Sequence, residues 1–237
     1  MLDDSAVERV LCVMAHPDDV DFGLAGTVSR WTDAGIEVSY CMITSGDAGG
    51  FDPSVPRSEI AGIREREQTA AAKEVGVSDL RFLGYPDGQL EVSLGLRRDV
   101  ARVIREVRPQ RVVCQSPERN WERIYGSHPD HLAAGEATMC AVYPDSRNPF
   151  TFAETIGHLE AWTVNEVWIS AGARANHYVD ITKQFDRKNQ ALLRHESQIE
   201  SAEKLRELLT FWNGGNAKAA GMPDGALAEA FWVMDVT

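Results

Sequence analysis

Two short stretches of the chain carry a His-Pro-Asp unit. MAHPDDVDFG places a histidine and three acids directly after an apolar run, and SHPDH repeats the unit more than a hundred residues later. Deprotonated carboxylates and neutral imidazoles bind divalent metals. Two such groups stand three residues apart in each stretch, His16 with Asp19 and His128 with His131. At a strand end or a helix start this spacing lets both side chains face one point, which predicts a metal site.

The number of donors fits a catalytic site. A catalytic zinc site uses about three protein ligands and leaves one position for water. His16, Asp19 and one histidine of the second pair would supply those ligands. Asp18 would then be free to take a proton from the water, and the remaining histidine could donate a hydrogen bond to a developing oxyanion. The spacing leaves open which histidine of the pair is the ligand.

The same residues also have structural interpretations. Asp18 and Asp19 could cap a helix expected at 20–34, and Asp130 could cap the next helix. We interpret the histidines outside the two units as surface or satisfied core residues: His158, His177 and His195.

The two stretches follow predicted strands. Short apolar runs rich in β-branched residues predict strands at 7–15, 37–44, 79–85, 111–116, 164–170 and 177–182. Helical spacing predicts helices at 22–35, 58–76 and 95–108, another from about Asp130, and one or two within 183–212. Ser58 is the expected N-cap of the second helix. The tail EAFWVMDV predicts a last strand or a docked segment.

The alternation of strands and helices predicts an α/β fold with a parallel sheet and right-handed crossovers. We expect one domain over 1–237, with its core at 7–182 and a helical C-terminal segment at 183–212. In an open sheet of this kind, ligands bind beyond the carboxyl ends of the strands. HPDDVD follows the first strand, TSGDAGG the second, and the loop at 115–131 the fourth. The fold can therefore bring the acids and histidines together.

Composition excludes several classes of function. A chain of 237 residues with 43% hydrophobic content can bury a sizeable core. Its net charge of −12 and pI of about 4.9 argue against a nucleic-acid or anionic-membrane surface, which needs basic side chains. We expect no membrane insertion and no signal peptide. Three of the four cysteines lie in apolar runs, so we expect a reducing cytoplasm.

At this point the motifs resemble those of the PIG-L/LmbE-like N-acetyl-sugar deacetylases, a family that includes mycothiol- and bacillithiol-pathway enzymes. AHPDDVDFGLAGT and HPDHLAAG are similar to its two signature motifs. Between them, TSGDAGG, RERE…AAAKEVGV and FLGYPDGQL are similar to its intervening segments, in the family's order. The likeness covers about residues 7–140, and YVDIT at 178–182 is a fainter match; the rest of the chain from Ser146 on is not aligned.

The resemblance implies a Rossmann-like fold with a variable C-terminal part and zinc-dependent amide hydrolysis, with Fe²⁺ as another candidate metal. It assigns His16, Asp19 and His131 as metal ligands, so it decides which histidine of the pair binds metal. It further implies that Asp18 is the general base and that His128 stabilises the tetrahedral intermediate. Arg64 and Asp87 fall where family members contact the sugar.

One departure from the motif is the acid at Asp21, which is one methylene shorter than the glutamate common in the family. The implied substrate is a small N-acetyl amino-sugar conjugate such as an N-acetylglucosaminide, and a homo-oligomer is compatible with the motifs. Two alternatives stay open: a metal-dependent amidase that removes a larger acyl group from a thiol or glycoside conjugate, and a non-catalytic doubly wound ligand-binding module. Phe51, Trp121 and Tyr125 could stack on a sugar or anchor their loops.

Overall fold

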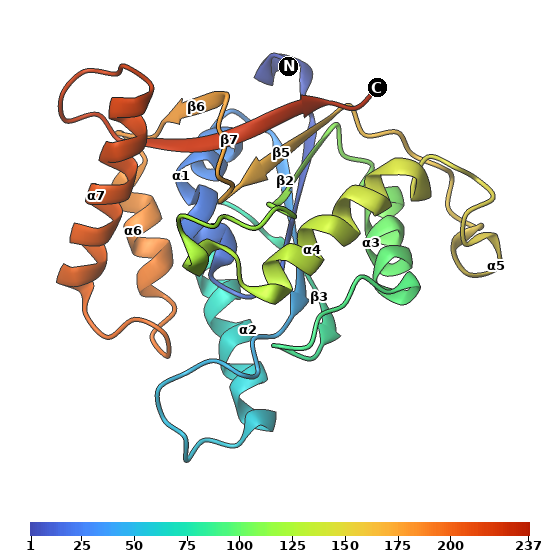
Figure 1. Cartoon of the computed structure of the whole chain (residues 1–237), viewed down its shortest axis with the longest axis horizontal. Helices are drawn as coiled ribbons and strands as arrows, with labels where there is room; N and C mark the ends of the chain where they lie inside the picture. The colour runs from blue at the N-terminus through green and yellow to red at the C-terminus, as the bar shows by residue number, and fades with distance from the viewer.

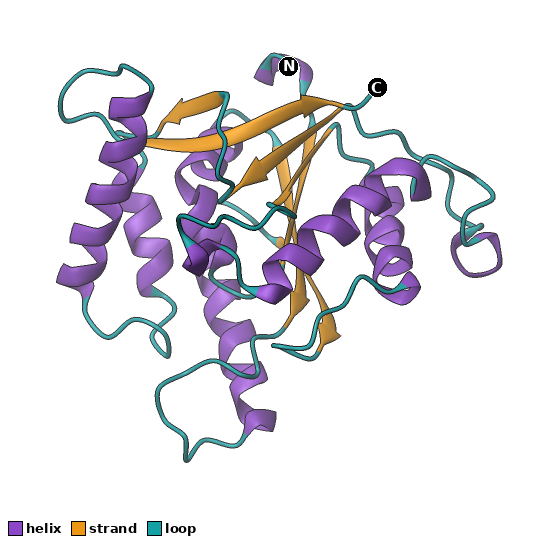
Figure 2. Ribbon diagram, viewed as in Figure 1, coloured by secondary structure: helices purple, strands orange, loops and turns teal.

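A seven-stranded sheet crosses the molecule in the order β3-β2-β1-β4-β5-β7-β6 (Figure 2). The computed structural model describes residues 1–237 apart from the side chain of Tyr125. The strands are β1 (Arg9–Met14), β2 (Glu37–Thr44), β3 (Asp79–Tyr85), β4 (Arg111–Gln115), β5 (Glu166–Ser170), β6 (His177–Asp180) and β7 (Ala228–Asp235). The first five pair in parallel, and β7 runs antiparallel to both β5 and β6. The predicted α/β class with a largely parallel sheet is confirmed.

Helices cover both faces of the sheet (Figure 1). They are α1 (Asp19–Asp33), α2 (Arg57–Glu74), α3 (Leu94–Val107), α4 (Pro129–Cys140), α5 (Ala153–Ile156), α6 (Phe185–Leu193) and α7 (Ala202–Ala219). Apolar side chains of α1, α2, α6 and α7 share one core cluster, and those of α3 and α4 share the other. In the described part of the chain, no helix combines the length and the hydropathy needed to cross a membrane.

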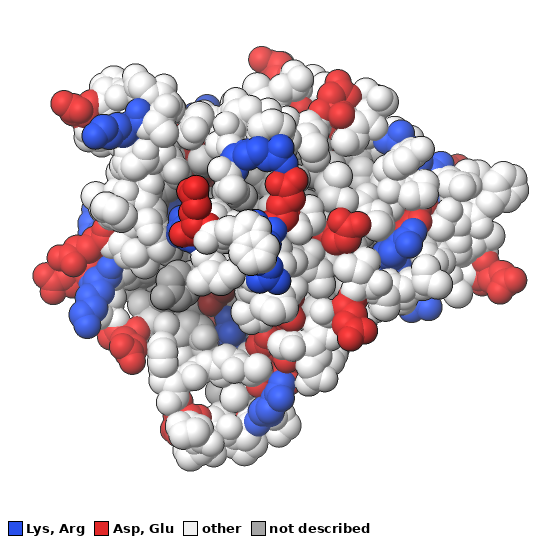
Figure 3. Space-filling view, in the orientation of Figure 1, with Lys and Arg blue, Asp and Glu red and all other residues white. Residues whose placement is uncertain are grey.

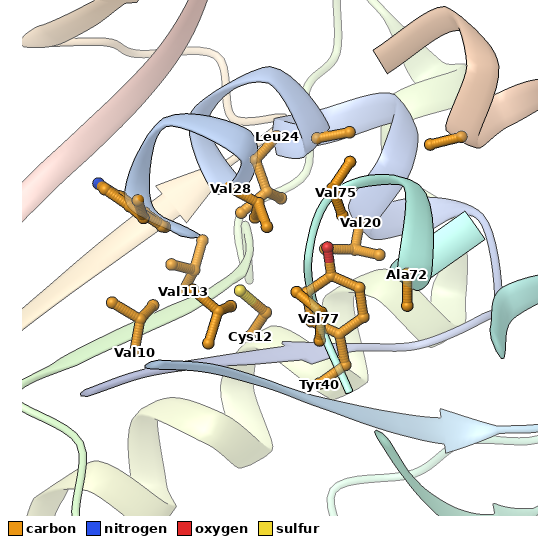
Figure 4. Packing of buried hydrophobic residues seen from close by; sticks show 14 of the residues in the cluster. Val10, Cys12, Val20, Leu24, Val28, Tyr40, Ala72, Val75, Val77 and Val113 are labelled. Atoms are coloured by element: carbon orange, nitrogen blue, oxygen red, sulfur yellow. The ribbon is translucent and has the colours of Figure 1, made fainter. Parts of the chain in front are cut away.

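Strand β1 shows why its apolar run is continuous. Cys12 and Met14 pack into the cluster on the α1 side, whereas Leu11 and Val13 pack into the cluster on the α3 side. Successive side chains of a strand point to opposite faces, so a strand covered on both faces needs apolar residues at every position. Figure 4 shows Cys12 lying beneath the helix residue Val28, on the α1 side of the sheet.

The structure corrects one predicted cap and decides between the alternatives at two other segments. Ser58 is not the N-cap of α2, because the helix starts one residue earlier, after Pro56, and Ser58 lies inside its first turn. The segment at 183–212 forms two helices, one of the predicted alternatives, but the second continues beyond the predicted end to Ala219. The tail is a strand, β7, which is one of its two predicted alternatives, and it lies between β5 and β6 in the sheet.

Helix α1 contains a break that two distant charged residues stabilise. Leu24 has φ −152° and ψ 16°, which interrupts the helical hydrogen bonding. The Glu229 carboxylate accepts hydrogen bonds from the two backbone N–H groups that begin the second half, at 3.1 and 2.7 Å. Lys188 Nζ donates to Phe22 O in the first half and to Glu229 Oε1, both at 2.6 Å. The buried pair therefore satisfies backbone groups that the break leaves without helical partners.

Candidate active site

The C-terminal ends of the neighbouring parallel strands β1, β2 and β4 lie side by side at the same end of the sheet. Gln115 Oε1 accepts a hydrogen bond from the backbone N–H of Ala15 at 2.9 Å. Ala15 O in turn accepts from the backbone N–H and from Oγ1 of Thr44, both at 2.9 Å. These bonds join the three strand ends, so the two His-Pro-Asp units start from positions fixed relative to one another. The second unit opens α4 (Figure 1), and Figure 3 shows charged atoms of both signs within a hollow of this face.

The first unit turns sharply at Asp18. This residue has φ +85°, in the left-handed region that residues other than glycine seldom adopt. Its backbone N–H donates to Gln68 Oε1 at 2.7 Å, and its carbonyl accepts from two N–H groups of the first turn of α1, both at 2.9 Å. Arg64 donates to Pro17 O just before the turn. Partners on both sides therefore hold the turn in a strained conformation.

Three predicted ligands lie together at this turn. His16 Nδ1 is 3.2 Å from Asp19 Oδ2 and 3.3 Å from His131 Nε2, and His131 Nε2 is 3.0 Å from Asp19 Oδ1. Ligands bound tetrahedrally at zinc distances lie about 3.3 Å apart. The spacing of these donor atoms therefore fits a divalent cation between them, and the structure brings together residues that are more than a hundred positions apart in the sequence.

Two other donor groups share His16. His16, His128 and His131 form one, and His16, Asp87 and Asp130 form the other. In the second group, His16 Nε2 lies 3.0 Å from Asp87 Oδ1 and 3.2 Å from Asp130 Oδ2. Both acids also accept hydrogen bonds from backbone N–H groups of neighbouring loops, and these bonds fix the loops in place. A carboxylate on the far nitrogen of a ligating histidine orients its ring. His16 Nδ1 is thus left facing Asp19 and His131.

Charge in the site favours a cation. Burial opposes a positive charge on His16, but the carboxylates of Asp19, Asp130 and Asp87 outweigh it and raise the pKa of His16 to about 12. Burial likewise opposes charge on Asp19, yet His131 and His16 hold the pKa of its carboxyl well below its usual range. The three carboxylates thus create a negative potential at the imidazoles, which stabilises a proton or a metal ion there.

Asp18 differs from its neighbour Asp19 in its contacts. Its Oδ2 accepts a hydrogen bond from Arg64 Nη2 at 2.9 Å, and its side chain keeps 17% of its surface exposed. Burial raises the pKa of Asp18 to about 6, although the Arg64 guanidinium acts in the opposite direction. A carboxyl group with a raised pKa that solvent can reach is suited to proton transfer near neutral pH.

His128 is the N-cap of α4. Its Nδ1 accepts a hydrogen bond from the backbone N–H of Asp130 at 3.2 Å, which leaves the proton of a neutral ring on Nε2. Burial, together with the neighbouring imidazoles of His16 and His131, lowers the pKa of His128. The ring is therefore a neutral donor at the mouth of the site. Asp130, predicted as the cap, lies inside the helix and bonds His16 instead.

The two predicted sugar contacts lie in the site but are mostly covered. Arg64 keeps 4% of its surface exposed and Asp87 keeps 8%. A side chain at Gly46 or Gly49 would collide with the Arg64 guanidinium, and Gly46 has φ +65°. The glycine-rich loop after β2 therefore makes room for an arginine. Among the aromatics, Phe51 and Trp121 are exposed, and Tyr125 lies outside the described side chains.

Sequence reasoning missed a buried set of polar residues behind the turn. Gln68, Asp21 and His195 are all 0% exposed. Asp21 Oδ2 accepts hydrogen bonds from Gln68 Nε2 and from His195 Nε2, both at 2.9 Å. His195 was interpreted as a surface or satisfied core residue. It is a core histidine whose Nε2 is bonded to Asp21, whereas its Nδ1 is buried and has no hydrogen-bond partner among the described residues. The sequence feature that could have revealed this set is Asp21, an acid among the apolar residues of the buried face of α1.

Imidazoles and carboxylates gathered at the carboxyl edge of a doubly wound sheet, with a further carboxylate beside them, are the arrangement expected of an α/β metal-dependent hydrolase. Comparison with known families agrees with this class. The profile of the PIG-L family, described as GlcNAc-PI de-N-acetylase, matches residues 11–142. The chain belongs to the PIG-L family.

Individual relatives extend the likeness. The chain is 34% identical over 193 residues to diacetylchitobiose deacetylase of Thermococcus kodakarensis, covering 81% of this chain and 71% of that one. It is 29% identical over 232 residues to a probable N-acetyl-alpha-D-glucosaminyl L-malate deacetylase 2 of Bacillus anthracis, covering 95% and 94%. The structure of N,N'-diacetylchitobiose deacetylase from Pyrococcus horikoshii, in complex with an inhibitor, matches with a TM-score of 0.89 and 28% identity, covering 98% and 85%. The likeness therefore includes the C-terminal third, where only the fainter match at 178–182 was recognised.

Proposed function

We propose that the protein is a metal-dependent N-deacetylase that removes an acetyl group from an amino-sugar conjugate such as an N-acetylglucosaminide. The observation that carries the proposal is the cluster of His16, Asp19 and His131, whose donor atoms lie 3.0–3.3 Å apart next to Asp18. Membership of the PIG-L family supports the reaction. The names of the relatives, which refer to chitobiose and to N-acetylglucosaminyl malate, support an N-acetylglucosamine unit in the substrate.

His16, Asp19 and His131 would hold the metal. Two imidazoles and one carboxylate suit Zn²⁺, and Fe²⁺ accepts the same donors. A divalent ion bound there supplies Lewis acidity, which polarises a carbonyl group and lowers the pKa of water toward roughly 7. Asp87 and Asp130 hold the His16 ring from its other nitrogen, so that Nδ1 stays directed at the remaining ligands.

Asp18 moves the proton. Its carboxylate takes a proton from the water that attacks the acetamide carbonyl, and the acid so formed returns that proton to the leaving amine. His128 donates from Nε2 to the oxyanion of the tetrahedral intermediate, an interaction that is commonly worth about 3 kcal/mol. Arg64, bonded to Asp18, stabilises the ionised carboxylate before it takes the proton and after it has returned it.

Arg64 and Asp87 remain our proposed sugar contacts. Each lies within hydrogen-bond distance of a proposed site residue, Arg64 of Asp18 and Asp87 of His16. A substrate hydroxyl that reached either side chain would be held close to the acetamide. We also keep a reducing cytoplasm as the proposed compartment, because all four cysteines are free thiols and three of them are buried.

The test is metal reconstitution combined with product analysis. The purified protein is stripped with a chelator, reloaded with Zn²⁺ or anaerobically with Fe²⁺, and assayed for free amine and free acid on glucosaminides carrying acetyl or longer acyl groups. We expect activity to follow metal content and acetate to be the preferred acid. His131→Ala should lose metal and activity, whereas His158→Ala, at an exposed histidine, should lose neither.

The alternatives have their own outcomes. Preferential release of a longer acid would establish the amidase instead. Tight binding of an amino sugar by the reloaded protein without release of any acid would establish the ligand-binding module.

A further inference from the structure

A fully buried histidine from the C-terminal part of the chain reaches the turn that carries the proposed base. His195 lies between α6 and α7 and is 0% exposed. Its Nε2 is 2.9 Å from Asp21 Oδ2, and Asp21 belongs to the first turn of α1. The contact joins residues 174 positions apart in the sequence. Neither residue is among the ligands or the proton-transfer groups of the proposed reaction.

Gln68 continues the connection from Asp21 to Asp18. Its Nε2 donates to Asp21 Oδ2 at 2.9 Å, and its Oε1 accepts from the backbone N–H of Asp18 at 2.7 Å. The amide has one orientation that satisfies both neighbours, because Asp21 offers an acceptor and the Asp18 backbone offers a donor. The carboxylate of Asp21 therefore sets which end of the Gln68 amide faces Asp18.

The Asp18 backbone needs such support. Its φ of +85° is a conformation that costs a residue other than glycine free energy, and it persists only where surrounding groups hold it. If the Gln68 amide turned, its NH₂ group would face the Asp18 N–H and the bond would be lost. His195 opposes this by donating to the same carboxylate oxygen that fixes the amide.

We propose that His195 is a positioning residue for the general base Asp18 and acts through Asp21 and Gln68. The inference rests on the proposed deacetylase function. His195 does not touch the substrate in this account. It keeps the Asp18 carboxylate at one place and in one direction, which is the requirement for efficient proton transfer.

The experiment compares His195→Leu with His195→Gln in the metal-loaded full chain, and His177→Leu is the matched control at a half-buried histidine of β6. We expect His195→Leu to lower kcat by about tenfold or more, as for a lost bond to a charged group, while KM and metal content change less than about twofold. His195→Gln keeps an N–H donor and should recover most of the kcat. His177→Leu should leave kcat unchanged.

A second arm tests whether His195 acts through Asp18. In an Asp18→Ala background, adding His195→Leu should cause no further loss of the residual rate, because the group that His195 positions is absent. An equal further loss would overturn the proposal, as would a His195→Gln variant that is as impaired as His195→Leu. If His195→Leu does not fold, Gln68→Met removes the middle of the connection and should give the same lowered kcat at unchanged KM.

A structural arm separates this proposal from the proposed function. If the wild-type enzyme releases no acid from any acyl glucosaminide, the proposed function fails. The crystal structures of the wild type and of His195→Gln and His195→Leu still decide the positioning role. Asp18 should stay in the left-handed region in the first two and leave it, or move its carboxylate, in the third. An Asp18 that is unchanged in His195→Leu would overturn the positioning role.

Discussion

Asp18 and Asp19 are neighbours with opposite environments. Asp19 meets two imidazoles, which hold the pKa of its carboxyl well below its usual range despite its burial. Asp18 meets one arginine, and burial raises its pKa to about 6. Environments that push two carboxyl pKa values apart assign the two groups different tasks. The turn at Asp18 produces this separation, because it directs adjacent side chains to different partners.

Removing the charge of Asp18 while keeping its shape tests this division of tasks. Asp18→Asn should retain the metal and lower kcat by about 10²–10⁴-fold, the usual contribution of a positioned acid or base. Metal analysis and steady-state kinetics on an N-acetylglucosaminide measure both quantities.

The control for this prediction is Asp224→Asn, which removes an exposed carboxylate and should leave metal content and kcat at wild-type values. Two results would contradict the assignment: an Asp18→Asn enzyme with near-normal kcat, or a loss of activity that follows a loss of metal.

At the scale of elements, α1 carries the site on its first turn and a break one turn later. The Lys188–Glu229 pair at this break is nearly fully buried, with 1% of each side chain exposed. Glu229 comes from β7 and Lys188 from α6, so two elements of the C-terminal part hold the helix that follows the first His-Pro-Asp unit. The local geometry of the site therefore depends on distant secondary structure.

Lys188→Met tests how much this pair contributes to folding. The substitution leaves a buried carboxylate without its cation and Phe22 O without its donor, so the free energy of unfolding should fall by about 3–5 kcal/mol. Urea denaturation measures the change. Lys218→Met, at an exposed lysine of α7, should stay within about 0.5 kcal/mol of the wild type. A loss below about 1 kcal/mol for Lys188→Met would show that the pair is of little consequence to stability.

Local patterns predicted most strands and the position of both His-Pro-Asp units after strand ends, because hydrophobic periodicity and turn residues act over a few positions. The start of α2 was misplaced by a serine that resembles a cap, although Pro56 precedes the helix. The contacts of Asp21 with Gln68 and His195 span 47 and 174 positions, and no short-range pattern encodes them. The family resemblance named the proposed ligands, which lie together in the structure, but not the residues behind them. Sequence therefore predicted which proposed site residues lie together, but not the buried polar residues that pack behind them.

At the scale of the whole molecule, the sheet includes a strand that lies beyond residue 182, where the predicted core ends. The segment after residue 182 contributes α6, α7 and the inserted strand β7. Phe231, Leu192 and Leu209 are fully buried in the same cluster as Cys12 and Met14 of β1. The C-terminal part is therefore continuous with the core beneath the site.

A chain truncated after residue 182 should not fold cooperatively. It would expose the surfaces of α1 and α2 that α6 covers, and it would leave β6 without its partner β7. Thermal unfolding followed by circular dichroism should show a sharp transition for the full chain and none for the truncated chain. A truncated chain that melts cooperatively close to the full chain would contradict this prediction and establish 7–182 as a folding unit.

The insertion of β7 between β5 and β6 also bears on synthesis. During translation β6 leaves the ribosome well before β7, yet its ladder partner in the finished sheet is β7. Until β7 emerges, β6 has no strand to pair with and Glu229 cannot accept the hydrogen bonds of the broken helix α1. The turn that carries His16, Asp18 and Asp19 then precedes a helix that lacks these contacts. The nascent polypeptide should therefore gain its enzymatic competence only after β7 has cleared the exit tunnel.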